Sequence, residues 1–203
     1  MTKLYGLDTG RIQALNDGIF AVVITILVLQ LKVPEELSHS ELVSFLLSNL
    51  MYQLLIFLMS FVILGAFWID SHYHHHLIVK TDRISIWLNI TFLMFICLIP
   101  FSTDFMASYS YDRMSIIVYS CNLICASLCH FCMLLYSWKK KFIMPYISTS
   151  IYRNMILRIM IPIVVYISVI PLSFFFKGWI TLLFTAPLFF QIVYGRSKEE
   201  TEI

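Results

Sequence analysis

From Arg11 to Leu31 the chain reads RIQALNDGIFAVVITILVLQL, an apolar segment with Asn16 and Asp17 near its start. An apolar segment of about 20 residues is long enough to cross a bilayer as a helix. An ionisable side chain within a membrane span is costly unless it faces protein or a water-filled path. This segment is therefore the first place to look for function.

The composition predicts that the whole chain is a membrane protein. Of its 203 residues, 60% are hydrophobic and 13% are charged, whereas a soluble domain is about half apolar and about a quarter charged. Six segments are predicted as transmembrane helices: 12–31, 42–69, 84–106, 115–138, 155–176 and 179–194. We expect one all-α membrane domain of six helices. Little sequence is left for a soluble domain with a catalytic site, so an enzyme is not expected.

The basic residues are distributed unevenly between the two sides that an even number of spans defines. The side that holds both termini carries eleven of them: Lys3, Arg11, Lys80, Arg83, Lys139, Lys140, Lys141, Arg153, Arg158, Arg196 and Lys198. The other side carries only Lys32, Arg113 and Lys177. Because Lys and Arg collect on the cytoplasmic side, we predict a multi-pass protein of the cell (inner) membrane with both termini in the cytoplasm.

Asp17 is predicted to belong to a buried polar network. If the first helix begins near Thr9, Asp17 lies about two turns inside it, too deep for the helix cap that is the simpler interpretation. Trp68 and His72 are four residues apart, so they share one face at the matching end of the second span. Both side chains can donate hydrogen bonds to a carboxylate. We expect Asp17 to find its partner among Arg11, Trp68 and His72.

Four histidines, at positions 72, 74, 75 and 76, lie in a segment that we predict to be a loop, Ser71–Arg83. Imidazoles bind zinc, but a defined site needs ligands from several elements and supporting hydrogen bonds. No zincin-like pattern with a glutamate is present. We therefore expect a loop that binds metals only adventitiously, and no metal cofactor.

Four cysteines form a helical stripe on the fourth predicted span: Cys121, Cys125, Cys129 and Cys132. The spacing i, i+4 on a helix does not suit a disulfide. Small side chains on one helix face favour close helix packing in membranes. We interpret the stripe as a packing interface within the fold.

The first helix carries an apolar stripe, Val22, Ile26 and Leu29, at i, i+4 and i+7, with Thr25 beside it. Most such stripes simply face lipid or neighbouring helices. Here the same helix carries the charge of the polar network, and Gly18 permits close approach of a neighbour. A ring of apolar side chains closes a pore by dewetting, and a threonine hydroxyl helps to coordinate a passing cation.

The pattern Arg11-x-x-x-Leu15-Asn16-Asp17, followed by an apolar helix, resembles the R-x-x-x-F-S-D motif of the transmembrane-protein-175 family of potassium channels. The likeness continues with three further stretches: Phe67-Trp68 and His72, then Asp82-Arg83 and Trp87-Leu88-Asn89, then Ile99-Pro100-Phe101-Ser102-Thr103. It covers about the first half of the chain. The chain departs from the motif at Leu15, where the family has Phe, and at Asn16, where it has Ser.

The resemblance implies a homotetramer in which the first helix of each chain lines a central pore. The implied constriction is formed by Val22, Ile26 and Leu29, and Thr25 bears on selectivity. The implied network that holds the pore helix consists of Arg11, Asn16, Asp17, Trp68 and His72. The implied permeant ion is K⁺, with other monovalent cations. The expected partners are further copies of the chain and the lipid bilayer, with no cofactor and no nucleic acid. Independently of the family, one helix per chain cannot enclose a water path, so several chains are needed.

Two other functions stay open from the residues alone. A proton-coupled transporter with Asp17 and His72 as its relay predicts saturable, pH-driven flux. An intramembrane metalloenzyme built on His74–His76 predicts stoichiometric metal. Both lack a set of acids that converge from several spans, so we expect a channel.

Overall fold

The computed structural model describes residues 9–34, 38–109, 112–145, 147–176 and 179–188. In this part of the chain every regular element is a helix. The elements, in order, are α1 (Thr9–Ile26), η1 (Leu27–Gln30), α2 (His39–Phe45), η2 (Leu46–Leu50), α3 (Met51–Leu77), α4 (Arg83–Cys97), α5 (Ile99–Ser108), α6 (Arg113–Lys139), α7 (Thr149–Leu172) and η3 (Trp179–Thr185).

Five helical stretches of the described chain are long and apolar enough to cross a membrane. They are Thr9–Gln30, His39–Leu77, Arg83–Ser108, Arg113–Lys139 and Thr149–Leu172. These stretches contain or overlap the first five predicted spans. The predicted sixth span, 179–194, begins with η3, and its residues 189–194 lie outside the described part of the chain. The chain is a multi-pass helical membrane protein.

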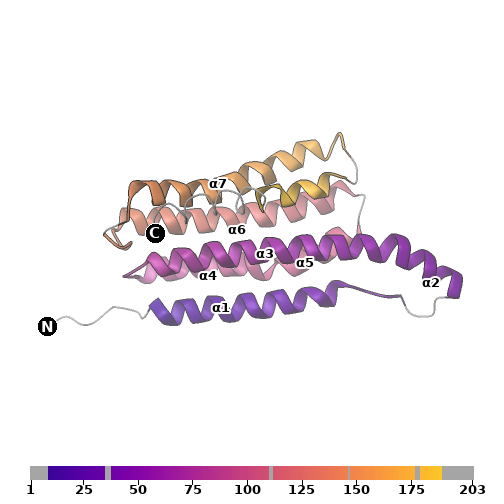
Figure 1. The fold of residues 1–203 in the computed structure, drawn as a ribbon, viewed down its shortest axis with the longest axis horizontal. Coiled ribbons are helices and arrows are strands. Elements are labelled where there is room, and N and C mark those ends of the chain that lie inside the picture. Colours follow the sequence, from indigo (N-terminus) through magenta and orange to yellow (C-terminus); the bar gives the residue numbers. More distant parts are fainter. Residues whose placement is uncertain (1–8, 35–37, 110–111, 146, 177–178, 189–203) are drawn as a thin grey trace, which may run out of the picture.

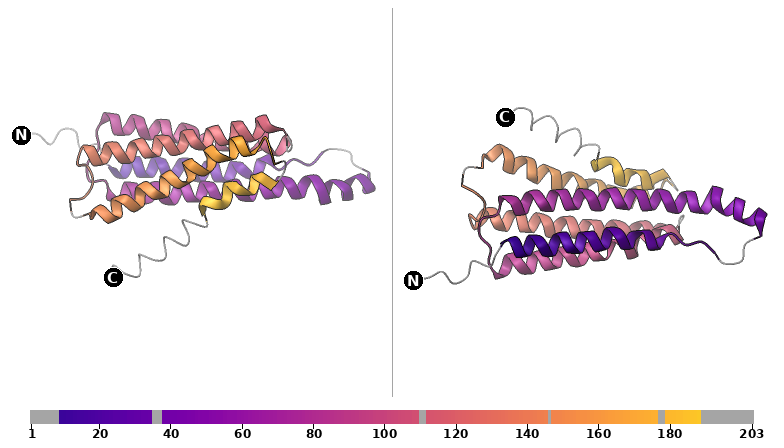
Figure 2. Two further views of the ribbon diagram at one scale, coloured as in Figure 1. Left: turned by 90° about the horizontal axis from the view of Figure 1, so that it is seen from above. Right: turned by 60° about the horizontal axis from the view of Figure 1, so that its bottom comes forward.

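The helices form one elongated bundle with α1 along one side (Figure 1). The helices α3 and α4 contact α1, and α6 lies between α4 and α7. The second stretch, from α2 through α3, has 39 residues, which is about 58 Å of helix at 1.5 Å per residue. It is longer than a bilayer core, and its α2 end extends past the other helices (Figures 1 and 2).

The predicted third span is interrupted near its middle, between α4 and α5. Pro100, at the start of α5, has no N–H and cannot continue the hydrogen bonding of α4. The hydroxyls of Ser102 and Thr103 both donate to the carbonyl oxygen of Ile99, at 3.0 and 2.8 Å. These side chains bond to the first residue of α5, directly after the break.

A small polar cluster lies inside the apolar core and joins three helices. The hydroxyls of Ser60 in α3 and Tyr119 in α6 are 2.8 Å apart, and the hydroxyl of Thr103 in α5 lies 3.0 Å from that of Ser60. All three side chains are buried. Buried hydroxyls without partners are costly, so this cluster specifies how α3, α5 and α6 fit together.

The predicted histidine loop is wrong in its first half, because α3 continues through Leu77. His74 is fully buried, with its ring 5.4 Å from that of His130, which lies 5.2 Å from the ring of Phe92. The helix continues because these imidazoles pack against α4 and α6 instead of facing water. In the described part of the chain no group of three His, Cys, Asp or Glu side chains could hold a metal ion.

The predicted interface of the cysteine stripe is also wrong. Cys121 and Cys132 are exposed, and Cys125 and Cys129 are only partly buried; all four are free thiols. The buried face of α6 lies two positions away along the helix and includes Tyr119, Leu123, Ala126 and His130. This buried face contacts α4 and α7, so the cysteines lie toward the outside of this chain.

Asp82 begins α4 by accepting a hydrogen bond from the backbone N–H of Ser85 at 2.9 Å. It also accepts one from the hydroxyl of Tyr136 at 2.6 Å, which ties the start of α4 to α6. Burial by itself would raise the pKa of the Asp82 carboxyl, but the hydrogen bonds from Tyr136 and Ser85 and the charge of Lys140 outweigh it and lower that pKa.

We expect Asp82→Ala to lower the free energy of unfolding by about 1 kcal/mol at pH 7, the usual effect of losing a helix cap. A carboxyl whose pKa is lowered by folding stabilises above its ordinary pKa of about 4, and this contribution is lost as pH falls through the folded-state value. Thermal melts of the purified protein in detergent, from pH 7 down to pH 3, should show the difference from wild type shrinking. A difference that stays constant across this range would contradict the account, and Asp82→Asn, which keeps an acceptor, is the control.

Candidate functional site: the anchored face and the exposed face of the first helix

One face of α1 is buried against the rest of the chain. Its contact residues recur at i, i+4, i+7 and i+11: Asn16, Phe20, Val23 and Leu27. The ring of Phe20 lies 6.2 Å from that of Phe92 in α4. This spacing is that of a single helix stripe, so the rotation of α1 about its own axis is defined.

The predicted constriction residues lie on the other side of α1. Val22, Ile26 and Leu29 are 53%, 41% and 69% exposed. Thr25 is exposed beside them, and its hydroxyl donates to the carbonyl oxygens of Ala21 and Val22, at 3.0 and 2.8 Å. The four residues therefore share one uncovered surface, which continues from α1 into η1 at Leu29 and which we call the exposed face of α1.

Small residues on the exposed face leave room for a close neighbour. Ala14, Gly18 and Ala21 follow one another at i, i+4 and i+7, and all three are exposed. A Cβ built on Gly18 would meet nothing within 4 Å. Small residues in this pattern let the backbones of two membrane helices approach closely.

Asp17 is held by the indole of Trp68. The Nε1–H of Trp68 donates to the Asp17 carboxylate at 2.9 Å, which links α1 to α3. The imidazole of His72 lies 5.5 Å from the indole, and its Nδ1 is 3.5 Å from the side-chain nitrogen of Gln13. The ring of His72 therefore packs beside the indole. Within the described part of the chain, His72 has no hydrogen bond to Asp17.

Asn16 forms the buried half of the contact between α1 and its neighbours. Its side-chain nitrogen donates to Ser71 at 2.9 Å, and its oxygen accepts from the side-chain nitrogen of Asn89 at 2.8 Å. Only 3% of Asn16 is exposed. The Nδ1 of His75 lies 2.8 Å from the Ser71 carbonyl oxygen, which can only accept, so this nitrogen carries the proton. One amide thus joins α1 to both α3 and α4.

The structure does not bring all the predicted network residues together. Arg11 is exposed on the first turn of α1 and has no hydrogen bond or ion pair with another described residue. Two residues that sequence reasoning missed, Ser71 and Asn89, are the direct partners of Asn16. A signal for Asn89 was present, since it is an amide within the apolar segment 84–106, where an unpaired polar group is costly.

The arrangement is suited to holding a helix and not to bond chemistry. Its members are amides, a hydroxyl, an indole and a carboxylate, each in a contact that fixes orientation. A proton relay from Asp17 to His72 has no hydrogen-bonded path among the described residues. Fold and site define a multi-pass helical membrane protein whose first helix is anchored by polar contacts on one side and uncovered on the other.

Comparisons with known proteins agree with this class. The family described as endosomal/lysosomal potassium channel TMEM175 matches residues 11–100. A potassium channel of Chamaesiphon minutus is 40% identical over 104 residues, which are 50% of this chain and 51% of that protein. A potassium channel of a Chryseobacterium species is 28% identical over 121 residues, 60% of each chain. The chain thus matches between about half and three fifths of the length of these relatives.

Two solved structures share the fold over almost the whole chain. The crystal structure of a lysosomal potassium-selective channel TMEM175 homolog from Chamaesiphon minutus has a TM-score of 0.75 and 26% identity, covering 91% of this chain and 97% of that one. The crystal structure of a variant of the potassium channel MtTMEM175 has a TM-score of 0.62 at 16% identity, covering 98% and 99%, and shows likeness of fold alone. Residues 11–100 thus resemble the TMEM175 family in sequence, and almost the whole chain shares the fold of a TMEM175 homolog.

We expect Asn16→Leu to lower the free energy of unfolding by about 1–3 kcal/mol, because it leaves Ser71 and Asn89 buried without their partner. Asp17→Asn, which keeps an oxygen for the Trp68 indole, should cost less. Thermal unfolding of the purified variants in detergent measures both. Equal stability of Asn16→Leu and wild type would show that this contact does not hold α1.

Proposed function

We propose that the chain forms a potassium-permeable ion channel, a homotetramer in which α1 of each copy lines a central pore. The exposed face of α1 carries this proposal. It presents Val22, Ile26 and Leu29 outward while the opposite face is fixed to α3 and α4. Further copies of the chain are the partner, and K⁺, with other monovalent cations, is the permeant species.

An apolar helix face could also lie against lipid, so the residues beside the stripe help to distinguish a pore from a lipid contact. Small residues at positions 14, 18 and 21 suit a helix contact, and a lipid-facing surface has no need of them. The hydroxyl of Thr25 lies beside these apolar side chains. Its oxygen can coordinate a cation that passes. The family match covers this same helix, and the relatives that resemble the chain are named potassium channels.

In the proposed channel, Val22, Ile26 and Leu29 form stacked apolar rings. Such rings exclude water when narrow, so an ion crosses only where it can lose part of its hydration shell. Thr25, between two of these levels, supplies an oxygen to the partly dehydrated ion. Selectivity then depends on the width of the rings and on this hydroxyl, and no cofactor takes part.

The anchored face gives the rings their geometry. The contacts of Asn16 and Asp17 hold α1 against α3 and α4. We propose that these residues, with Trp68 and His72, keep the pore helix in the rotation that conducts ions. Arg11 then pairs with anionic lipid headgroups or with a neighbouring copy of the chain.

We further propose that the channel lies in the cell (inner) membrane with both termini in the cytoplasm. The excess of Lys and Arg on the side of the termini supports this orientation. In it, Arg11 and the Asp17 contact lie at the cytoplasmic end of the pore, and Leu29 lies at the outer end.

Single-channel recording of the purified protein in planar bilayers tests the proposal. Under a K⁺/Na⁺ gradient we expect discrete currents that reverse toward the K⁺ potential. Ile26→Asn and Leu29→Asn should change conductance or selectivity, because an amide hydrates an apolar ring. Ile26→Val, which keeps the ring apolar, is the matched control and should retain most of the selectivity.

Silence in bilayers combined with pH-driven uptake in vesicles would overturn the channel and favour a proton-coupled transporter. Currents that are insensitive to both asparagine variants would retain a channel but remove α1 from its pore.

The assembly has its own test at Gly18. A Cβ there meets nothing within this chain, so Gly18→Leu should leave the single chain folded. We expect it to disrupt the tetramer, because the larger side chain keeps neighbouring helices apart. Native mass spectrometry of the detergent-solubilised protein would reveal smaller species for Gly18→Leu, with Gly18→Ala remaining tetrameric. A tetramer in both variants would contradict the close contact.

A further inference from the structure

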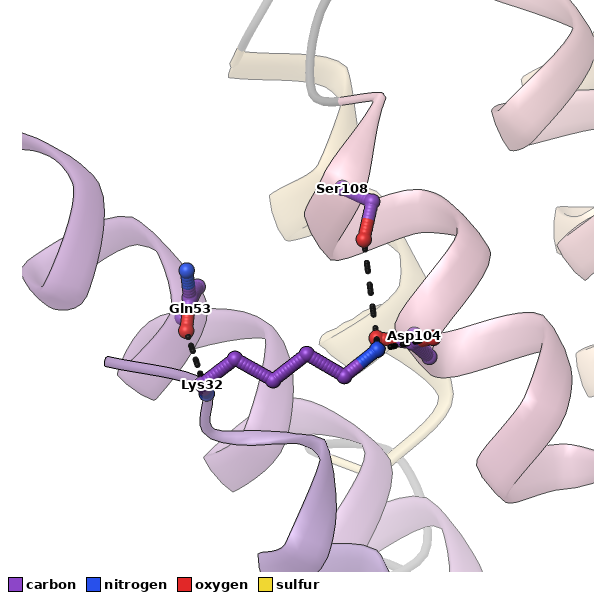
Figure 3. Close-up of polar contacts among 4 residues, drawn as sticks. All are labelled: Lys32, Gln53, Asp104 and Ser108. Carbon is purple, nitrogen blue, oxygen red and sulfur yellow. Dashed lines mark hydrogen bonds and ion pairs between the residues drawn. The ribbon is translucent and has the colours of Figure 1, made fainter. Parts of the chain in front are cut away.

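An ion pair ties the end of the first helical stretch to α5. The ammonium of Lys32 donates to both carboxylate oxygens of Asp104, at 2.8 and 2.9 Å, and Ser108 lies 3.5 Å from the same carboxylate (Figure 3). The backbone N–H of Lys32 donates to the side chain of Gln53 in α3 at 3.1 Å. Both the backbone and the side chain of Lys32 are therefore held.

This ion pair lies close in sequence to the outer end of the proposed pore. Lys32 follows Leu29, the last residue of the apolar stripe, by three residues, which span at most about 11 Å of chain. The Debye length is about 10 Å at 0.1 M salt and about 30 Å at 0.01 M. A charge on Lys32 thus acts on an ion that approaches the level of Leu29, most strongly at low salt.

The two side chains of the pair differ in how far they are exposed. The Lys32 side chain is 62% exposed and that of Asp104 is 27% exposed. Without the carboxylate, only the backbone of Lys32 is held, and the ammonium moves freely on a flexible four-carbon side chain. In the pair, the positive charge is directed to α5 and is neutralised there.

We propose that Asp104 is a conduction-determining residue: it neutralises Lys32 at the outer end of the pore, so that the copies of this lysine do not repel entering cations. The inference rests on the channel proposed above. In a tetramer, loss of Asp104 leaves four lysine charges around one opening without their carboxylate partner. Loss of Lys32 leaves four negative charges, which concentrate cations.

The simpler account is a surface ion pair with only a small structural effect. The two accounts differ in sign. A structural tie is lost equally when either partner is removed, so Lys32→Gln and Asp104→Asn should then act alike. An electrostatic role predicts opposite effects of these two variants on conductance.

The experiment is single-channel recording of wild type, Asp104→Asn, Lys32→Gln and the double variant in 0.01 M and 1 M KCl. At the lower concentration we expect Asp104→Asn to reduce K⁺ conductance by about twofold or more and Lys32→Gln to raise it. The double variant should return toward wild type. At 1 M, where the Debye length is about 3 Å, the differences should nearly vanish. Ser108→Ala, which leaves the pair intact, is the control.

Changes of the same sign in both single variants, or none in either, would overturn the proposal. If the wild type itself carries no current, the channel function fails. The pair is then tested by amine-selective acylation of the purified protein, followed by mass spectrometry. Pairing should make Lys32 label more slowly in wild type than in Asp104→Asn, and equal rates would overturn the pairing as well.

Discussion

The buried contact of Asn16 with Ser71 and Asn89 is the constraint on which the arrangement of this protein depends. Between membrane helices there is little hydrophobic force, since lipid is as apolar as the side chains, so packing and polar contacts decide how helices meet. An amide that finds partners on both α3 and α4 defines one rotation of α1. A slip of one residue would turn the helix by about 100°, bury part of the exposed face and leave Asn16 in an apolar environment.

The two polar links of α1 differ in depth and have different consequences. Asn16 is buried, and its bonds specify the rotation of the helix. Asp17 pairs with an indole that is itself 39% exposed, so this link lies nearer the outside of the chain. At the other end of the stretch, Lys32 is tied to α3 through its backbone and to α5 through its side chain. The helical stretch is therefore fixed at both ends, and the exposed face between them is left uncovered by the rest of this chain.

Much of the fold follows from periodicity and composition. The apolar segments predicted the first five membrane stretches, and the depth of Asp17 in its helix indicated a polar contact with the second span. Trp68 is the partner of Asp17, but this contact is partly exposed and not buried as predicted. The errors have physical causes. Polar histidines suggested a loop after residue 70, but burial against α4 and α6 continued the helix through Leu77. The cysteine stripe suggested a contact face, but a neighbouring face of α6, which includes Tyr119, Leu123 and Ala126, forms it.

The sequence by itself determined that this chain is a helical membrane protein, which end of each span carries its positive charge, and that the first helix bears an apolar stripe and a polar motif. These properties follow from local patterns, namely the length and hydropathy of each segment and the residue spacing along one helix. Only the tertiary structure decided that Asn16 joins Ser71 to Asn89, that His74 lies beside His130, and that Lys32 meets Asp104. Those contacts bridge 55 to 73 residues of sequence in the first and last cases. They depend on which helix faces meet, and no local pattern contains that information.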